Sequence, residues 1–273
     1  MPRMSIQGAD LEYDEVGHGR PLVLLHSLLA DRSAFERVLP FLAPGRRLLI
    51  VSLPGFAGSA AAGPSIEAYA DRVAGLFAAL DLPVDTDVLG NGFGGFVAVA
   101  LAIRHGRLFD RLVLSDAGAT FSPEGRAAFH VMAAKVAEAG MAGVAGIAML
   151  RLFPEAYIEA SPAVVERCRQ ALLRTDPAMF ARACMILAEL DLSDQVADIR
   201  NPTFVLVGSL DAATPPAMSR ALAAAIPGAR FLELDGLGHA PHVQAPERFA
   251  SAVTDFLAVP SQGAPALRSA AGG

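Results

Sequence analysis

The sequence predicts an α/β protein with a mostly parallel sheet, helices on both faces and one helical insert. Short apolar runs of strand type alternate along the chain with longer amphipathic runs, and this alternation is typical of such sheets. The chain has 273 residues, of which 53% are hydrophobic. That is enough to bury a large core, and single α/β domains reach this length.

Continuous apolar runs predict strands that are buried on both faces. They lie at 21–26, 48–51, 87–89, 112–114 and 203–207, with a last strand at 231–234. Helices are predicted between them. Ser65 can cap one helix, Phe96 to His105 form another, and a last helix begins near Pro246.

The alternation stops between about 119 and 192, where only helical patterns occur, at 124–138, at 164–173 and after Asp176-Pro177. A helical insert between strands predicts a lid over the carboxyl ends of the sheet, where open α/β sheets bind ligands. We therefore expect a core made of 1–118 and 193–259, a lid at 119–192, and a disordered tail at 260–273 that is rich in Ala, Gly, Ser and Pro.

Composition argues against several classes of partner. The net charge is −6 and basic residues form no run, so nucleic acid and anionic membrane surfaces are not expected partners. The longest apolar run, 93–103, is shorter than the about 20 residues that span a bilayer. No signal peptide is evident, and Cys168 and Cys184 have the pattern of buried free thiols. We expect a cytoplasmic protein without cofactor or metal; the oligomeric state stays open.

The segment 88–96 (VLGNGFGGF) joins a predicted strand to a predicted helix. Gly90 and Gly94 flank a central residue, as in the nucleophile elbow G-x-S-x-G, where strand and helix pass very close. The central residue here is Gly92. A dinucleotide-binding fingerprint fits poorly, because the glycine spacing differs and the segment is not the first strand–helix unit.

Two later loops complete the pattern. The segment 207–215 (VGSLDAATP) places Asp211 after a strand, and 236–242 (GLGHAPH) places His239 after the last strand. The order of nucleophile, acid and histidine is that of the α/β hydrolases. Each loop alone is a weak signal, but the three together are strong.

On these motifs the chain resembles the α/β-hydrolase superfamily from about 11 to 257. Segment 25–31 (LHSLLAD) and the lid are similar to 3-oxoadipate enol-lactonases, while 90–95 (GNGFGG) with 101–105 (LAIRH) is similar to carbon–carbon hydrolases of meta-cleavage pathways. The resemblance implies the α/β-hydrolase fold, with a mostly parallel eight-stranded sheet. It also implies Asp211 as acid, His239 as base, and the backbone amides of Phe93 and Leu28 as oxyanion hole.

The chain departs from these families at three positions. They carry serine where this chain has Gly92, and their usual His-Gly and Asp are replaced by His26-Ser27 and Ser52. Gly92 excludes an acyl-enzyme on its own side chain. Three explanations stay open: His239 activates a water in the vacated space, the protein binds ligands without turnover, or the serine was removed deliberately. Aminoacrylate hydrolases, which resemble this fold, also lack the serine.

Other side chains are candidates for supporting roles. Ser27 and Ser115 are candidate substitute nucleophiles, and Asp116 is an alternative acid, although Asp211 fits better. His26 and His242 are expected to be structural. Arg104 and Arg151 are candidates to meet a substrate carboxylate, and apolar lid residues such as Met132, Ile147 and Leu150 are candidates to line the pocket.

Together these patterns predict a hydrolase acting on a small ester, lactone or related carbonyl compound, with Asp211 and His239 activating water. The alternative is a non-catalytic ligand-binding protein of the same fold.

Overall fold

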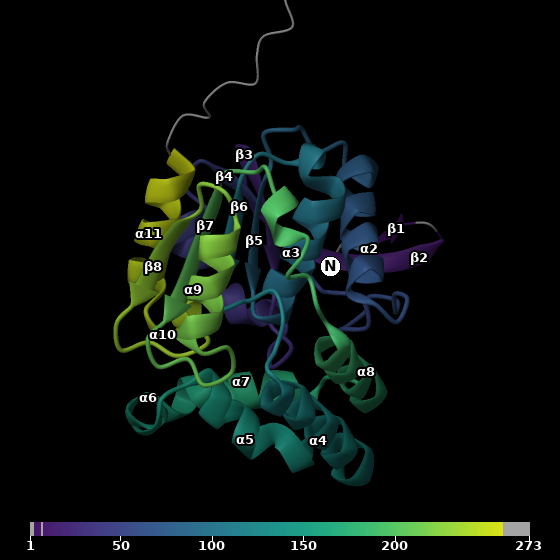
Figure 1. The fold of residues 1–273 in the computed structure, drawn as a ribbon, viewed down its shortest axis with the longest axis vertical. Coiled ribbons are helices and arrows are strands. Elements are labelled where there is room, and N and C mark those ends of the chain that lie inside the picture. The colour runs from purple at the N-terminus through teal and green to yellow at the C-terminus, as the bar shows by residue number, and fades with distance from the viewer. Residues whose placement is uncertain (1–2, 7, 259–273) are drawn as a thin grey trace, which may run out of the picture.

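An eight-stranded sheet forms the centre of the protein (Figure 1). The computed structural model describes residues 3–6 and 8–258, so the tail expected at 260–273 lies outside the described residues. The strands are β1 (Arg3–Ile6), β2 (Ala9–Gly17), β3 (Arg20–Leu25), β4 (Arg46–Val51), β5 (Asp87–Asn91), β6 (Leu112–Ser115), β7 (Thr203–Gly208) and β8 (Arg230–Leu234).

The strand order is β1-β2-β4-β3-β5-β6-β7-β8. Strands β1 and β2 pair antiparallel, as do β2 and β4, and every other pairing is parallel. The predicted mostly parallel eight-stranded sheet is therefore confirmed. The carboxyl ends of β3, β5, β6, β7 and β8 lie at one edge, so the loops that follow them can meet there.

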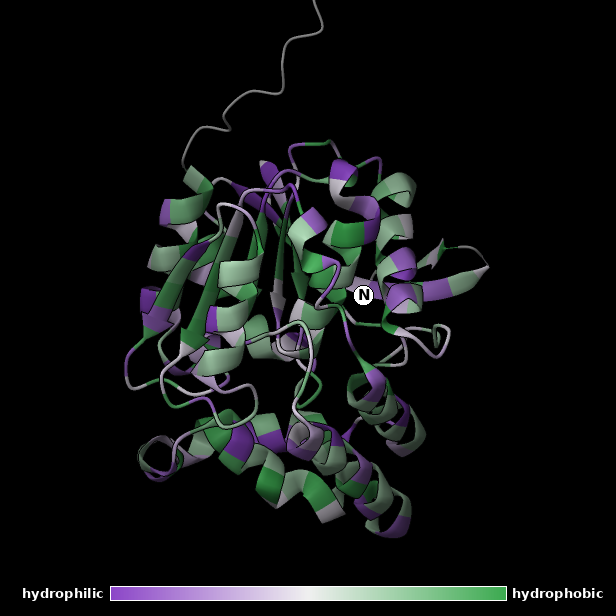
Figure 2. Cartoon of the chain, viewed as in Figure 1, coloured by the Kyte–Doolittle hydropathy of each residue, from purple (hydrophilic) through white to green (hydrophobic). Residues whose placement is uncertain are grey.

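Helices cover both faces of the sheet. Side chains alternate along β3: Val23 and Leu25 pack in one hydrophobic cluster, and Leu22 and Leu24 in the other, as strand geometry requires. Figure 2 shows the central strands as predominantly hydrophobic. The helices are α1 (Leu39–Leu42), α2 (Ile66–Ala79), α3 (Phe93–His105), α4 (Pro123–Ala139), α5 (Ala142–Leu152), α6 (Glu155–Ala160), α7 (Pro162–Leu173), α8 (Pro177–Glu189), α9 (Pro216–Ala225), α10 (Pro241–Gln244) and α11 (Pro246–Ala258), with 3₁₀ helices η1 (Arg32–Phe35), η2 (Gly106–Leu108) and η3 (Val196–Asp198).

The predicted caps form. The Ser65 side chain accepts a hydrogen bond from the backbone amide of Ala68 at the start of α2, and the Asp176 side chain accepts one from Met179 at the start of α8. These bonds satisfy amides that a helix leaves without partners at its first turn. None of the described helices is long and apolar enough to cross a bilayer.

Five helices, α4 to α8, lie between β6 and β7 in the sequence. In Figure 1 they occupy the lower end of the molecule, beyond the body of the sheet. Met132 faces the cavity above the elbow, whereas Ile147 and Leu150 are exposed, so these two do not line it. The boundaries at 119 and 192, and the function of this insert as a lid, remain predictions.

Candidate active site

A sharp turn at Gly92 joins β5 to α3. Its backbone has φ 54° and ψ −120°, a left-handed conformation that glycine adopts without steric cost. A Cβ atom on Gly90 would collide with the carbonyl of Gly94, and one on Gly94 would collide with the carbonyl of Leu25. The two flanking glycines are thus explained by close backbone approach, as the elbow motif predicts.

The space above Gly92 contains two side chains from distant parts of the sequence. A Cβ atom placed on Gly92 would collide with Ser27 Oγ and would lie 2.6 Å from His239 Nε2. Ser27 Oγ itself lies 3.2 Å from His239 Nε2. The position from which an elbow side chain would start is therefore occupied by the Ser27 hydroxyl and bordered by the imidazole.

Asp211 and His239 form a hydrogen-bonded pair. Asp211 lies in the loop after β7, and His239 lies in the loop between β8 and α10. The distance between His239 Nδ1 and Asp211 Oδ2 is 2.9 Å, and both residues are buried. Because Nδ1 donates to the carboxylate, Nε2 is left as an acceptor that faces Gly92 and Ser27.

The loop after β7 holds the Asp211 carboxylate as an anion. Its Oδ1 accepts hydrogen bonds from the backbone amides of Ala213, at 2.7 Å, and Thr214, at 2.9 Å. The Thr214 hydroxyl lies 2.6 Å from Oδ2. Burial by itself raises the pKa of Asp211, but the charge and hydrogen bond of His239 and the contacts of Thr214 outweigh burial and lower it. No pattern in the sequence indicated the role of Thr214.

Two residues with unbonded backbone amides, Phe93 and Leu28, lie beside this pair in the wall of one cavity. Phe93 is the first residue of α3, and Leu28 follows Ser27 in the loop after β3. Neither amide has a hydrogen-bond acceptor within residues 3–6 and 8–258. Both residues line the same cavity as Gly92 and His239. This geometry fits the oxyanion hole that the resemblance implies, and that role remains a prediction.

A buried polar cluster lies beneath the site. Asp116 accepts a hydrogen bond from the backbone amide of Gly208 at 2.9 Å, and the Ser115 hydroxyl donates to it. Asn91 Nδ2 donates to the backbone carbonyl of His239 at 3.0 Å and to Asp116 at 3.2 Å. Burial and the nearby charge of Asp211 raise the pKa of Asp116 well above its usual value.

The hydrogen bonds of this region distinguish the two candidate acids, Asp211 and Asp116, and bear on whether a metal ion could bind here. It is Asp211, and not Asp116, that hydrogen-bonds to His239 in the structure. The ligand atoms of Asp116, Asp211 and His239 lie within 4.8 Å of one another. Asp211 Oδ2 and His239 Nδ1 are already engaged with each other, however, so we assign no metal to them.

The other candidate residues separate into two groups. Arg151 lines the cavity, and no carboxylate pairs with it in the described part of the chain. Arg104 lies elsewhere and forms an ion pair with Asp71 at 2.8 Å, so its expected contact with substrate is not supported. His242 packs between Phe35 and Phe249. His26 bonds to backbone groups, as expected; the structural role of both histidines remains a prediction.

The cavity over Gly92 is small and mostly apolar. Its free volume is about 30 Å³, and on this measure a cavity needs about 10–15 Å³ to hold one water molecule. The lining residues include Phe96, Phe121, Phe129, Met132 and Leu187.

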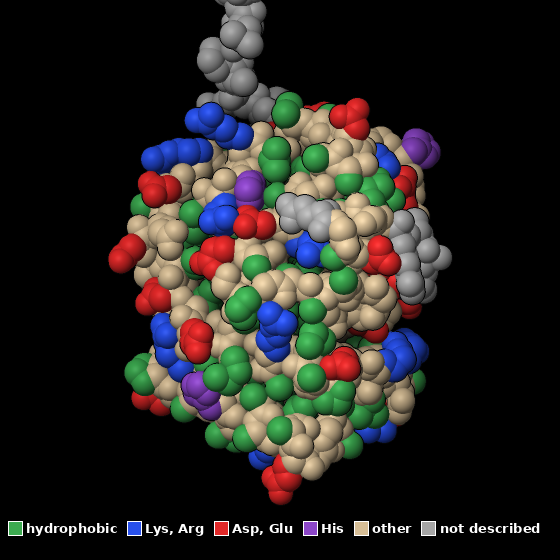
Figure 3. All heavy atoms as spheres, turned by 90° about the vertical axis from the view of Figure 1, so that its right-hand side faces the viewer, with side chains coloured by type: hydrophobic (Ala, Val, Ile, Leu, Met, Phe, Trp, Pro, Cys, Tyr) green, Lys and Arg blue, Asp and Glu red, His purple; other side chains and the backbone are tan. Residues whose placement is uncertain are grey.

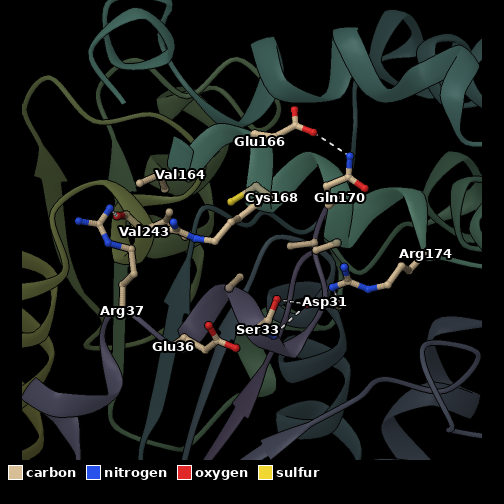
Figure 4. Close-up of a pocket in the computed structure, with 14 residues that line it drawn as sticks. Asp31, Ser33, Glu36, Arg37, Val164, Glu166, Cys168, Gln170, Arg174 and Val243 are labelled. Carbon is tan, nitrogen blue, oxygen red and sulfur yellow. Dashed lines mark hydrogen bonds and ion pairs between the residues drawn. The ribbon is translucent and has the colours of Figure 1, made fainter. Parts of the chain in front are cut away.

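A larger cleft, of about 330 Å³, lies between η1 and α7 (Figure 4). It shares no residue with the cavity over Gly92. Asp31 on one wall caps η1 through the amide of Ser33 and pairs with Arg174 at 3.2 Å.

Both cysteine thiols are free. Cys168 lies in this cleft and is half-buried, and Cys184 is buried. Burial raises their pKa values to about 11 and about 12, so neither is a thiolate at neutral pH.

Comparison with known proteins agrees with the fold. The model of the alpha/beta hydrolase family matches residues 22–252. A pimeloyl-[acyl-carrier protein] methyl ester esterase of Aromatoleum aromaticum is 32% identical, over 86% of this chain and 97% of the esterase. The crystal structure of an enol-lactonase from Burkholderia xenovorans LB400 superposes with a TM-score of 0.86 at 31% identity, over 94% of this chain and 99% of that one.

A thermophilic esterase from Thermogutta terrifontis, solved with malate bound, gives the same TM-score of 0.86 and 31% identity, over 94% of this chain and 98% of that one. The expected resemblance to enol-lactonases is thereby confirmed. These likenesses cover nearly the whole chain.

Proposed function

The chain belongs to the alpha/beta hydrolase family, and we propose that it hydrolyses a small ester or lactone in the cavity over Gly92. The observation that carries the proposal is the pair of His239 and Asp211, 2.9 Å apart, with the other ring nitrogen, Nε2, next to Gly92 in the wall of that cavity. Such a pair is the general-base unit of acyl transfer.

The proposed chemistry divides between the base and the amides. His239 Nε2 takes the proton of an attacking oxygen, and Asp211 stabilises the imidazolium that forms. The amides of Phe93 and Leu28 donate to the negative oxygen of the tetrahedral intermediate. The attacking oxygen belongs either to water, as the sequence suggests, or to a hydroxyl of the chain. The proposed function holds with both.

The cavity also supports a preference among substrates. The small, mostly apolar cavity favours a short acyl group, and Arg151 is the cationic side chain in the lining. Arginine pairs well with carboxylates because its guanidinium presents a planar set of donors. We therefore propose that the acyl group carries a carboxylate, and that this group pairs with Arg151.

Rates of hydrolysis of two chromogenic esters test the proposal. We expect this chain to hydrolyse p-nitrophenyl hydrogen succinate with a higher kcat/KM than p-nitrophenyl acetate. His239→Ala should lower both rates by at least about 100-fold, since general-base catalysis contributes about 10²–10⁴. The matched control is His130→Ala, because His130 is exposed on α4.

Equal rates for His239→Ala and the unaltered chain would contradict the proposed base. Absence of turnover by the unaltered chain, together with saturable binding of the esters, would support the ligand-binding alternative instead.

A further inference from the structure

We propose that Ser27 is the nucleophile of this enzyme, in place of the serine that the elbow lacks. The proposal rests on the proposed function, because it takes His239 and Asp211 as the base pair. It assigns a catalytic role to a residue of the loop after β3, which in the usual elbow arrangement supplies only the oxyanion hole.

The first argument is position. Ser27 Oγ occupies the space in which a side chain on Gly92 would begin, since a Cβ there would collide with it. Its hydroxyl therefore lies close to where the hydroxyl of an elbow serine would be activated. Ser27 also lines the cavity over Gly92, so a bound ester would meet this oxygen.

The second argument is the hydrogen-bond chain. Ser27 Oγ is 3.2 Å from His239 Nε2, and His239 Nδ1 is 2.9 Å from Asp211 Oδ2. Since Nδ1 donates to Asp211, the hydroxyl donates to Nε2. His239 is the one hydrogen-bond partner of this hydroxyl among the described residues. These are the relations of a serine, histidine and aspartate triad.

The third argument is the fixed backbone around Ser27. His26 Nδ1 donates to the carbonyl of Ser27 at 2.9 Å, and the amide of Leu53 donates to His26 Nε2 at 3.1 Å. The amide of Gly94 donates to the carbonyl of His26 at 2.9 Å, which ties the loop to α3. The hydroxyl is therefore carried by a rigid segment, as a nucleophile requires.

The fourth argument concerns the oxyanion. Leu28 follows Ser27 directly, as one oxyanion-hole donor follows the nucleophile in an ordinary elbow. Its amide, like that of Phe93, has no acceptor in the part of the chain that is described. The structure thus keeps two donors beside the relocated hydroxyl.

The reaction balances with these groups and one water. The Ser27 proton passes to His239 Nε2 while Oγ bonds to the carbonyl carbon, and the carbonyl oxygen becomes the oxyanion. Collapse breaks the bond to the alcohol, which leaves with the proton from Nε2. Water then gives a proton to Nε2 while its oxygen bonds to the acyl carbon. The bond from that carbon to Ser27 Oγ breaks, Oγ takes the proton back from Nε2, and the acid and free Ser27 are released.

Ser115, the other candidate serine, is placed differently. Its hydroxyl donates to Asp116 at 2.5 Å and lies 3.4 Å from Asn91 Nδ2. No hydrogen bond joins it to His239, and it does not line the cavity. The structure therefore favours Ser27 over Ser115.

Covalent labelling of the unaltered chain tests the proposal. The protein is treated with a small fluorophosphonate, and the modified peptide is located by mass spectrometry. We expect one adduct, on Ser27, that is absent from Ser27→Ala and at least tenfold slower to form in His239→Ala. Ser251→Ala, which removes an exposed serine of α11, should label at the unaltered rate. We also expect Ser27→Ala to lose at least about 100-fold in ester hydrolysis.

The outcomes separate this proposal from the proposed function. An unlabelled protein, or an adduct on another serine, overturns Ser27 as nucleophile. So does a Ser27→Ala variant that keeps its activity while His239→Ala loses it; water would then be the attacking group, and the proposed function would stand. If both variants hydrolyse esters at the unaltered rate, the proposed function itself fails. Because the labelling experiment is done on the unaltered chain, its result does not depend on whether any variant folds.

Discussion

Position 92 combines two constraints that glycine satisfies. The backbone there has a φ of 54°, which costs an ordinary residue about 1–3 kcal/mol, and a Cβ would collide with Ser27 Oγ. In an ordinary elbow the strain is accepted because the serine is needed. Here glycine relieves the strain and leaves room for the Ser27 hydroxyl, so the two residues depend on each other.

Exchanging these two residues tests that dependence. We expect Gly92→Ser alone to unfold at a lower temperature and to gain little esterase activity, because the new side chain collides with Ser27. The double variant Gly92→Ser with Ser27→Gly removes the collision and restores the usual His-Gly and elbow serine. It should exceed Gly92→Ser at least tenfold in kcat/KM. Ester hydrolysis and thermal unfolding of both single variants and the double variant measure the coupling.

A Gly92→Ser variant as active as the double variant would show that the two positions are independent. The space between Gly92 and Ser27 would then be large enough for both side chains, contrary to the collision that the structure indicates.

At the scale of elements, the ends of four strands bring the site together. Ser27 follows β3, Gly92 follows β5, Asp211 follows β7, and His239 follows β8. Because β3 pairs parallel with β5, and β7 with β8, the following loops open at one edge of the sheet. The short helix α10 then continues from His239 and places His242 between η1 and α11, in contact with Phe35 and Phe249.

His242 makes the stability of the α10 region depend on pH. Burial, with a smaller effect from the charge of His239, lowers its pKa to about 3, and its Nδ1 has no hydrogen-bond partner among the described residues. Below a pH of about 6.5 the unfolded chain binds a proton here that the folded protein does not. The free energy of unfolding therefore falls as pH decreases from about 6.5 toward 3, by up to about 1.4 kcal/mol per pH unit.

The variant His242→Phe should remove this dependence. Urea unfolding at pH 6, 5 and 4 should give a free energy that declines less steeply than that of the unaltered chain, by about 1.4 kcal/mol per pH unit. Parallel declines in the two proteins would mean that His242 is protonated in the folded state.

At the scale of the whole molecule, local sequence patterns predicted the strands, helix caps and elbow glycines, but not the contacts between residues far apart in the sequence. The buried strands, the caps at Ser65 and Asp176, and the elbow glycines follow from short-range geometry, so sequence alone revealed them. The contact between Ser27 and His239 joins residues 212 positions apart, and no local pattern encodes it. Thr214 and Asn91 were missed for the same reason, since their roles arise from packing between loops.

Charged side chains of both signs are spread over the surface of the protein. On the face shown in Figure 3, basic and acidic side chains are interspersed with apolar ones. The exclusion of nucleic acid and anionic membrane surfaces as partners remains a prediction. The candidate site is buried: Ser27 and His239 line the cavity over Gly92, and Ser27, Asp211 and His239 are each less than 5% exposed.

The most direct test of the account is the kcat/KM of Asp211→Asn for ester hydrolysis. An amide in place of the carboxylate no longer holds the imidazole in the tautomer that accepts a proton at Nε2, a change that costs about 10⁴ in a serine protease. We predict a loss of at least about 100-fold with the fold intact by circular dichroism. A value within twofold of the unaltered chain would contradict the assignment of Asp211 and His239 as the base pair.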